Sequence, residues 1–140
     1  MPFLHLRVAR PLGQELTQSL ATRLTAITHE HLHKRAEVTA VQIESVEPSQ
    51  WFVGARSLAA LERASFQLEI QVTEGTNTKA EKAAWIAAAW ALLDEACGPL
   101  HPASYAVVQE VRADAWGFGG ATQERRAILP DTPMVAPQPK

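Results

Sequence analysis

The sequence has one cysteine, Cys97, so a single chain cannot form a disulfide. A lone free thiol is typical of reducing compartments, which predicts a cytoplasmic location. Long hydrophobic runs are lacking too: the longest extends from Ala83 to Leu93, far short of the ~20 apolar residues that cross a bilayer. The first residues alternate between apolar and polar, so we expect no signal peptide. The sequence therefore predicts a soluble protein without a membrane partner.

A surplus of basic residues is also lacking, because 13 Lys and Arg stand against 15 Asp and Glu, for a formal net charge of −2. General nucleic-acid binders normally carry excess positive charge, so we expect no nucleic-acid partner. The 140 residues suffice for one domain, since chains of this size bury roughly 70% of their unfolded surface. We expect that domain to span residues 1–127. Residues 128–140 are rich in proline without periodicity, which predicts a tail.

What the sequence does contain is an internal repeat. The segment Val46–Ala55 resembles Val111–Gly120, and within them Trp51 and Trp116 stand 65 positions apart. Upstream, Leu-His-Leu-Arg-Val at residues 4–8 resembles Leu-Glu-Ile-Gln-Val, 64 positions later. Matches at nearly one offset predict a duplicated unit, with repeats at residues 2–63 and 64–127.

Both repeats show the same order of hydrophobic periodicities, namely strand, helix, strand and a glycine-marked hairpin. The predicted strands are Phe3–Ala9, Val38–Val46, Phe66–Thr73 and Ser104–Val111, and the predicted helices are Gly13–His33 and Lys79–Cys97. The fold class is therefore α/β. It consists of a duplicated β-α-β unit, with a four-stranded, mostly parallel or mixed sheet, two helices on one face and short hairpins. We expect the other face to carry apolar residues that a partner subunit covers.

Pro2 is the first candidate for chemistry. Removal of Met1, which a small second residue normally permits, would expose a secondary amine at the start of a strand. An N-terminal amine titrates near neutrality, and desolvation or a nearby cation lowers its pKa further. Such a group can act as a general base that removes a proton beside a carbonyl.

The start Met-Pro-Phe-Leu-His-Leu, the repeated β-α-β unit and the hairpin Trp-Gly-Phe-Gly-Gly together resemble the tautomerase superfamily. The likeness is to 4-oxalocrotonate tautomerase and to longer relatives in which two units are fused, and it covers residues 2–127. It implies that Pro2 is the catalytic base or acid, that Trp51 and Trp116 wall the pocket, and that the chain forms a homotrimer. The resemblance calls for no cofactor.

The sequence departs from this family at the cations that bind substrate carboxylates. Near the first strand–helix turn only Arg10 is close, and Ala40 and Tyr105 occupy a second arginine position. Thr73 and Thr76 replace the paired arginines of cis-3-chloroacrylic acid dehalogenase, and malonate semialdehyde decarboxylase has a pair that is missing here too. Threonine cannot supply the charge of a bidentate guanidinium. Dehalogenation or decarboxylation by those mechanisms is therefore disfavoured.

Three histidines, His29, His31 and His33, cluster near the end of the first predicted helix. His29 resembles a catalytic histidine of the dehalogenase, whereas the cluster as a whole is more typical of a solvated helix end than of a metal site. The Tyr105 hydroxyl could donate to a substrate oxygen. Arg56, Arg125 and Arg126 follow the two hairpins and could reach a neighbouring subunit's pocket. We predict no metal site.

These observations favour a tautomerase or isomerase that acts on a small carbonyl or enol compound. Pro2 and His29 are the predicted catalytic residues. The predicted substrate-binding residues are Tyr105, Trp51, Trp116, Thr73, Thr76 and Arg10. Two alternatives remain: a tautomerase-like protein that binds without turnover, and a hydratase or dehalogenase of an unsaturated acid.

Overall fold

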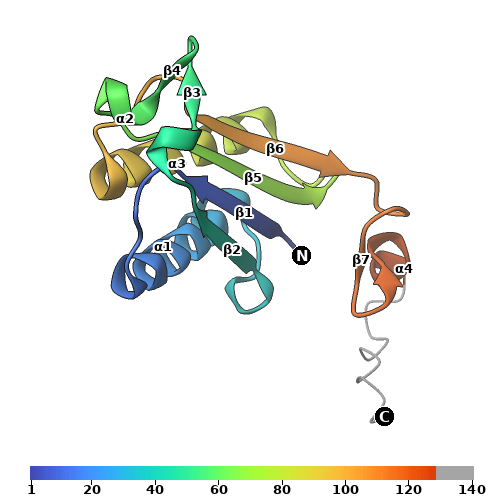
Figure 1. Cartoon of the computed structure of the whole chain (residues 1–140). Helices are drawn as coiled ribbons and strands as arrows, with labels where there is room; N and C mark the ends of the chain where they lie inside the picture. The colour runs from blue at the N-terminus through green and yellow to red at the C-terminus, as the bar shows by residue number, and fades with distance from the viewer. Residues whose placement is uncertain (129–140) are drawn as a thin grey trace.

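A computed structural model describes residues 1–128 of the chain (Figure 1), so the predicted tail lies outside the described residues apart from Ile128. The first half contains β1 (Phe3–Val8), α1 (Gln14–Leu32), β2 (Ala40–Ser45), β3 (Phe52–Val53), β4 (Arg56–Ser57) and α2 (Leu58–Leu61), and the second half contains β5 (Phe66–Thr73), α3 (Lys79–Cys97), β6 (Tyr105–Val111), β7 (Gly117–Phe118), β8 (Ala121–Thr122) and α4 (Gln123–Ile128). The predicted long strands and helices are confirmed to within two residues at each end. The short helices α2 and α4 carry too little periodicity to be predicted.

The four long strands form one mixed sheet in the order β2-β1-β5-β6. Each β-α-β unit supplies a parallel pair, β1 with β2 and β5 with β6. The two units meet at the centre, where β1 and β5 run antiparallel and His5 lies opposite Glu69. This register relates the two halves by an approximate two-fold axis. Equivalent residues of β1 and β5 are 64 positions apart in the sequence. Since Phe3 pairs with Ala40 and Gln67 pairs with Tyr105, the offset becomes 65 in the outer strands, as the repeat predicts.

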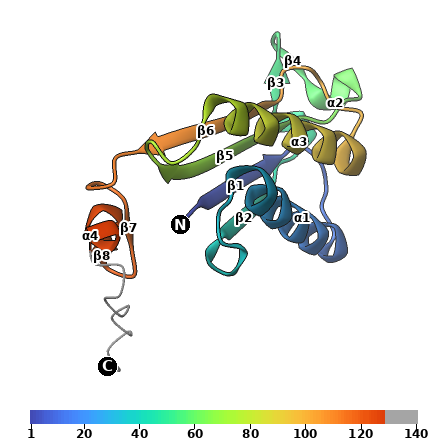
Figure 2. The same cartoon turned by 180° about the vertical axis from the view of Figure 1, so that it is seen from behind.

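Helices α1 and α3 lie side by side on one face of the sheet (Figure 2). The core lies between these helices and the sheet. The inward residues of β1 and β5 alternate with outward ones, as half-buried strands require. The largest fully buried side chains are Trp85, Phe66, Leu4, Leu6, Leu20, Leu24, Leu32, Leu58, Leu68, Ile70, Leu93 and Val8. Burying each of them contributes about 1.5–3 kcal/mol. None of the helices within residues 1–128 has the length and apolar character needed to cross a membrane.

The open face of the sheet is mostly polar, although it also carries apolar residues, as predicted. The register places His5, Arg7, Gln42, Glu44, Gln67, Glu69, Gln71 and Gln109 on this face, beside Phe3, Ala40, Tyr105 and Val107. Glu44 lies between two side chains of this face, 3.1 Å from His5 Nε2 and 3.6 Å from Arg7 Nε. The face is mostly polar because the polar members of each alternating strand all point to it once the helices cover the apolar members.

The two short hairpins project from opposite ends of the sheet (Figure 1). Each turns through two residues with positive φ, Gly54 and Ala55 in the first and Gly119 and Gly120 in the second. Such left-handed pairs match the twist of a two-residue hairpin. The antiparallel packing of β1 against β5 determines this placement. As a result the arm formed by residues 112–128 extends from the end of β6, near the start of β1.

Candidate active site

Pro2 lies directly before β1, at the end of the sheet where β5 and β6 finish. Its side chain is buried, and its carbonyl accepts a hydrogen bond from the backbone N–H of Ala40 at 3.2 Å. Continuing the β1–β5 register by two residues places Thr73 alongside Met1. The neighbouring strands therefore fix the backbone at Pro2, whereas Met1 is only partly buried.

The arm brings Trp116 to the same point. The indole Nε1–H of Trp116 donates to the carbonyl oxygen of Met1 at 3.1 Å. The backbone of Trp116 is held in turn, because its carbonyl accepts a hydrogen bond from the N–H of Gln123 at 2.8 Å where the hairpin closes. A side chain from the end of the second unit thus contacts the backbone that leads into the first strand.

Two cations act on the amine at this end of the chain. Burial has the largest effect, and the positive charges of Lys34 and Arg126 add to it, so the pKa of the terminal amine of Met1 lies below its ordinary value. Both burial and a nearby positive charge disfavour the protonated form of an amine. The structure therefore favours a neutral, basic nitrogen at this place.

Lys34 follows α1, and hydrogen bonds fix both ends of the residue. Its Nζ donates to the Thr76 hydroxyl at 2.8 Å, and that hydroxyl donates to the carbonyl of Thr73 at 2.6 Å. The Nδ1–H of His29 donates to the backbone carbonyl of Lys34 at 2.8 Å. Burial lowers the pKa of Lys34, and the carboxylate of Glu81 opposes this shift.

Arg126, the second cation, comes from α4. Its guanidinium carbon lies 4.5 Å from the centre of the Phe118 ring, a cation–π distance. Its side chain also contains a buried nitrogen, Nη1, that has no hydrogen-bond partner among residues 1–128. A buried charged N–H without an acceptor is unfavourable, so this atom is suited to contact an anionic oxygen.

Three solved structures show what this arrangement is similar to. Native fused 4-OT matches with a TM-score of 0.79 at 21% identity, over 89% of this chain and 98% of that one. The chain has the tautomerase fold. The R7 fused 4-OT wild-type asymmetric trimer matches at 0.78 and 18% identity, over 89% and 98% of the two chains. Pt0534 inactivated by 2-oxo-3-pentynoate matches at 0.77 and 14% identity, over 88% and 97%.

The comparison with solved structures confirms the fold that the resemblance in the sequence implies. No protein-family model and no curated protein matches the sequence. The function must therefore be inferred from the residues that this chain places within the tautomerase fold.

The single chain brings several of the predicted site residues together. Pro2 and Trp116 are joined through Met1, and Thr73 and Thr76 connect to the same end through Lys34. His29 is exposed and reaches the site indirectly, since its hydrogen bond is to the backbone of Lys34. These contacts span both repeats.

Arg10, Tyr105 and Trp51 lie at the opposite end of the sheet from Pro2. Arg10 follows β1, and its Nη1 donates to the carbonyl of Ala96 at 3.2 Å near the end of α3. Tyr105 begins β6 and is 62% exposed on the open face. Trp51 precedes the first hairpin. In one chain these three side chains do not meet Pro2, so they would reach a Pro2 site only from another copy.

Two cations near Pro2 fall outside the predicted site residues. Nothing in the local pattern around Lys34 distinguishes it from an ordinary lysine after a helix. Its position depends on the contact between the two halves, where Nδ2 of Asn77 donates to the carbonyl of Leu32 at 2.9 Å. Arg126 was expected to reach a neighbouring subunit, whereas the arm places it near the N-terminus of its own chain.

The three clustered histidines have separate partners. His33 Nε2 lies 2.9 Å from Glu81, and His31 Nε2 lies 4.0 Å from Glu30, while His29 bonds the backbone. Residues 1–128 contain no group of three His, Cys, Asp or Glu side chains arranged to hold a metal ion. The cluster is best described as a polar helix end, in which His29 alone contacts Lys34.

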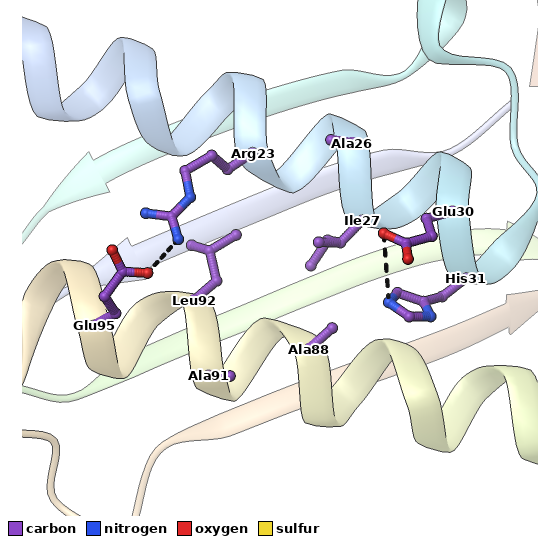
Figure 3. Close-up of a pocket in the computed structure, with 9 residues that line it drawn as sticks. All are labelled: Arg23, Ala26, Ile27, Glu30, His31, Ala88, Ala91, Leu92 and Glu95. Atoms are coloured by element: carbon purple, nitrogen blue, oxygen red, sulfur yellow. Dashed lines mark hydrogen bonds and ion pairs between the residues drawn. The ribbon is translucent and has the colours of Figure 1, made fainter.

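Hollows also occur away from the start of β1. One, of about 440 Å³, lies between α1 and α3 (Figure 3). Arg23 and Glu95 pair across it, and Glu30 and His31 stand further along. Another, of about 340 Å³, includes Arg10. Neither contains Pro2 or the residues that contact it.

Proposed function

We propose that the protein is a small-molecule tautomerase in which the nitrogen of Pro2, freed by removal of Met1, is the general base and acid. The observation that carries this proposal is the environment of the chain start. It is buried, and Lys34 and Arg126 lower the pKa of the amine there. A lowered pKa favours the neutral form of an amine, and a neutral secondary amine can accept a proton.

The reaction is a proton transfer between two positions of one substrate. Pro2 takes a proton from the carbon beside a carbonyl, and the electron pair of the broken C–H bond moves toward the carbonyl oxygen. The protonated Pro2 then returns the proton at a different atom. Because the transfer is redox-neutral, it requires no electron acceptor, in keeping with the expected lack of a cofactor.

Lys34 and Arg126 are proposed to replace the arginines that the sequence lacks. Both lie close enough to act on the terminal amine, and Arg126 offers a buried N–H without an acceptor. An enol or keto compound with one anionic group would satisfy both cations. His29 and Thr76 then act by holding Lys34, through its backbone carbonyl and its Nζ respectively.

The proposal is tested by the ketonisation of phenylenolpyruvate. Intact-mass measurement should first show a chain without Met1. Pro2→Ala should then lower kcat/KM by about 10²–10⁴-fold, the usual contribution of a positioned base, with an unchanged circular dichroism spectrum. Equal rates for wild type and variant would exclude the proline mechanism. As a second measurement, 2-oxo-3-pentynoate, which inactivates Pt0534, should label the N-terminal peptide.

A second candidate is a protein that binds a small carbonyl compound without turnover. It is favoured by the contact of Met1 with Trp116, because a retained Met1 makes the Pro2 nitrogen an amide and occupies the space beside it. Intact mass separates the two candidates. A chain that keeps Met1 and binds phenylpyruvate without ketonising its enol would support the binding protein.

We further propose that the chain forms a homotrimer in the cytoplasm. The R7 fused 4-OT is described as an asymmetric trimer. A trimer would also bring Tyr105 or Arg10 of one copy within reach of another copy's Pro2. Light scattering after size-exclusion chromatography should give three times the chain mass of 15.3 kDa. A mass of one chain at micromolar concentration would contradict this assembly.

A further inference from the structure

The hydrogen bond between Trp116 and Met1 defines a donor close to the Pro2 nitrogen. The carbonyl oxygen of Met1 and the nitrogen of Pro2 belong to one peptide group, so they are about 2.3 Å apart. The Trp116 Nε1 lies 3.1 Å from that oxygen. The two nitrogens are therefore no more than about 5.4 Å apart.

Removal of Met1 takes away the carbonyl oxygen to which this indole N–H donates. Trp116 is only partly exposed, and the hairpin holds its backbone through Gln123 and through the bond from Glu124 N–H to the Ala113 carbonyl at 3.0 Å. The ring thus stays in place while its N–H faces the space that Met1 leaves. A partly buried N–H gains by finding another acceptor there.

On the proposed function, we propose that Trp116 is a catalytic residue whose indole N–H donates to the carbonyl oxygen of the substrate. This oxygen then lies near the place of the Met1 carbonyl but further from the Pro2 nitrogen, because nitrogen and oxygen atoms that do not share a peptide group stay at least about 2.7 Å apart. A carbonyl oxygen and its neighbouring carbon fit between the two nitrogens, with one N–H···O bond at Trp116 and the reacting C–H directed at Pro2. As the C–H bond breaks, its electron pair forms the C=C bond and negative charge gathers on the oxygen, where the indole N–H stabilises it.

This role differs from that of an apolar wall, and two replacements separate the two roles. Trp116→Phe keeps an aromatic ring and removes the donor. Replacement of Trp116 by benzothienylalanine keeps the shape of the indole as well and exchanges only N–H for sulfur. Trp90→Phe is the matched control, because the ring of Trp90 on α3 packs against Phe66, with 6.0 Å between the ring centroids, at the opposite end of the sheet from Pro2.

Ketonisation of phenylenolpyruvate by the processed protein is the measurement. Loss of a hydrogen bond to a charged oxygen should lower kcat by about 10- to 100-fold in both Trp116 replacements. Trp90→Phe should stay within about twofold of wild type. Full activity of the benzothienylalanine protein would overturn the donor role. If Pro2→Ala were as active as wild type, the proposed function would fail first, so the two failures are distinguishable.

A measurement without turnover protects the inference against misfolded variants. In a ¹⁵N spectrum of the wild-type chain, phenylpyruvate should move the indole N–H signal of Trp116 downfield. The signal is assigned by its loss in Trp116→Phe. Saturation of the protein with phenylpyruvate without a shift of this signal would contradict the proposed hydrogen bond.

Discussion

The indole N–H of Trp85 donates to the hydroxyl of Thr28 at 3.1 Å, and this bond joins α3 to α1 inside the core. Both residues are fully buried. The Thr28 hydroxyl is satisfied in both directions, since it donates to the carbonyl of Leu24 in its own helix at 2.8 Å. The only threonine that is fully buried within residues 1–128 therefore has a definite partner on the facing helix.

Replacement of Thr28 by valine should lower the free energy of unfolding by about 1–3 kcal/mol, because it leaves a buried indole N–H without an acceptor. Thr25→Val is the control, since the Thr25 hydroxyl donates only to the Ala21 carbonyl of the same helix. Its effect should stay below about 0.5 kcal/mol. Urea unfolding measures both variants. Equal losses would show that the bond between the helices contributes nothing.

The pH dependence of activity should report the pKa of the Pro2 amine, which we expect to be lowered by burial, Lys34 and Arg126 as that of the Met1 amine is. The neutral amine is the base, so kcat/KM should rise with pH through that pKa and then level off. Lys34→Gln keeps a donor for Thr76 and removes a positive charge. The protonated amine then becomes less unfavourable, its pKa rises, and the acid limb moves to higher pH.

Arg126→Gln should move the acid limb in the same direction, and the double variant should move it further. Burial remains in all of these variants, so the pKa should not return fully to its ordinary value. Lys79→Gln, in the exposed first turn of α3, is the control and should leave the profile in place. Profiles that coincide for wild type and the double variant would disprove the influence of the two cations.

The thiol of Cys97 should resist modification in the folded protein. It is 1% exposed, and burial raises its pKa despite the opposing charge of Arg10. The contribution of the Cys97 thiol to the free energy of unfolding is therefore fully present below the pKa of the thiol in the unfolded chain. It is lost as the pH rises through the higher pKa of the thiol in the folded protein. Labelling with a disulfide reagent at pH 8 should be slow in buffer and immediate above the urea midpoint. Rapid labelling without urea would contradict the buried site.

The two hairpins predict opposite effects of glycine and alanine. Ala55 has φ of 63°, a left-handed value that costs an L-residue about 1 kcal/mol, whereas its counterpart Gly120 has φ of 85°. Ala55→Gly should raise the free energy of unfolding by about 0.5–1 kcal/mol, and Gly120→Ala should lower it by a similar amount. Gly13→Ala, at φ of −80°, should be nearly neutral. Thermal unfolding of the three variants would test the ranking, and destabilisation by Ala55→Gly would reverse it.

Local signals explain why the second unit could be predicted so closely. Alternation bounds β5 at Phe66–Thr73, and α3 begins after Thr78, whose side chain and that of Glu81 form a capping box. Gly98 follows the last residue of α3. Each of these features depends on neighbours in the sequence, so the sequence alone contains the information.

The site could be predicted only where one residue type carries the argument. Pro2 is a candidate because of its position in the chain and Trp116 because of the repeat, and the hydrogen bond at Met1 brings the two close together. Lys34 could not be found, because its charge acts on the amine only after α1 is packed against the turn before α3. Tyr105 showed the converse, since its correspondence to Ala40 across the repeat does not place it near Pro2 in the same chain.

The two-fold relation between β1 and β5 has a consequence for the number of reactive ends. Phe66 is the counterpart of Pro2 at an offset of 64 positions, and its nitrogen is a peptide amide bonded to Ser65. An amide nitrogen is not basic, whatever cations surround it. A single chain of two units therefore has one basic amine, where two separate units would have two. A trimer of this chain would carry three proline amines, half the number on six separate units.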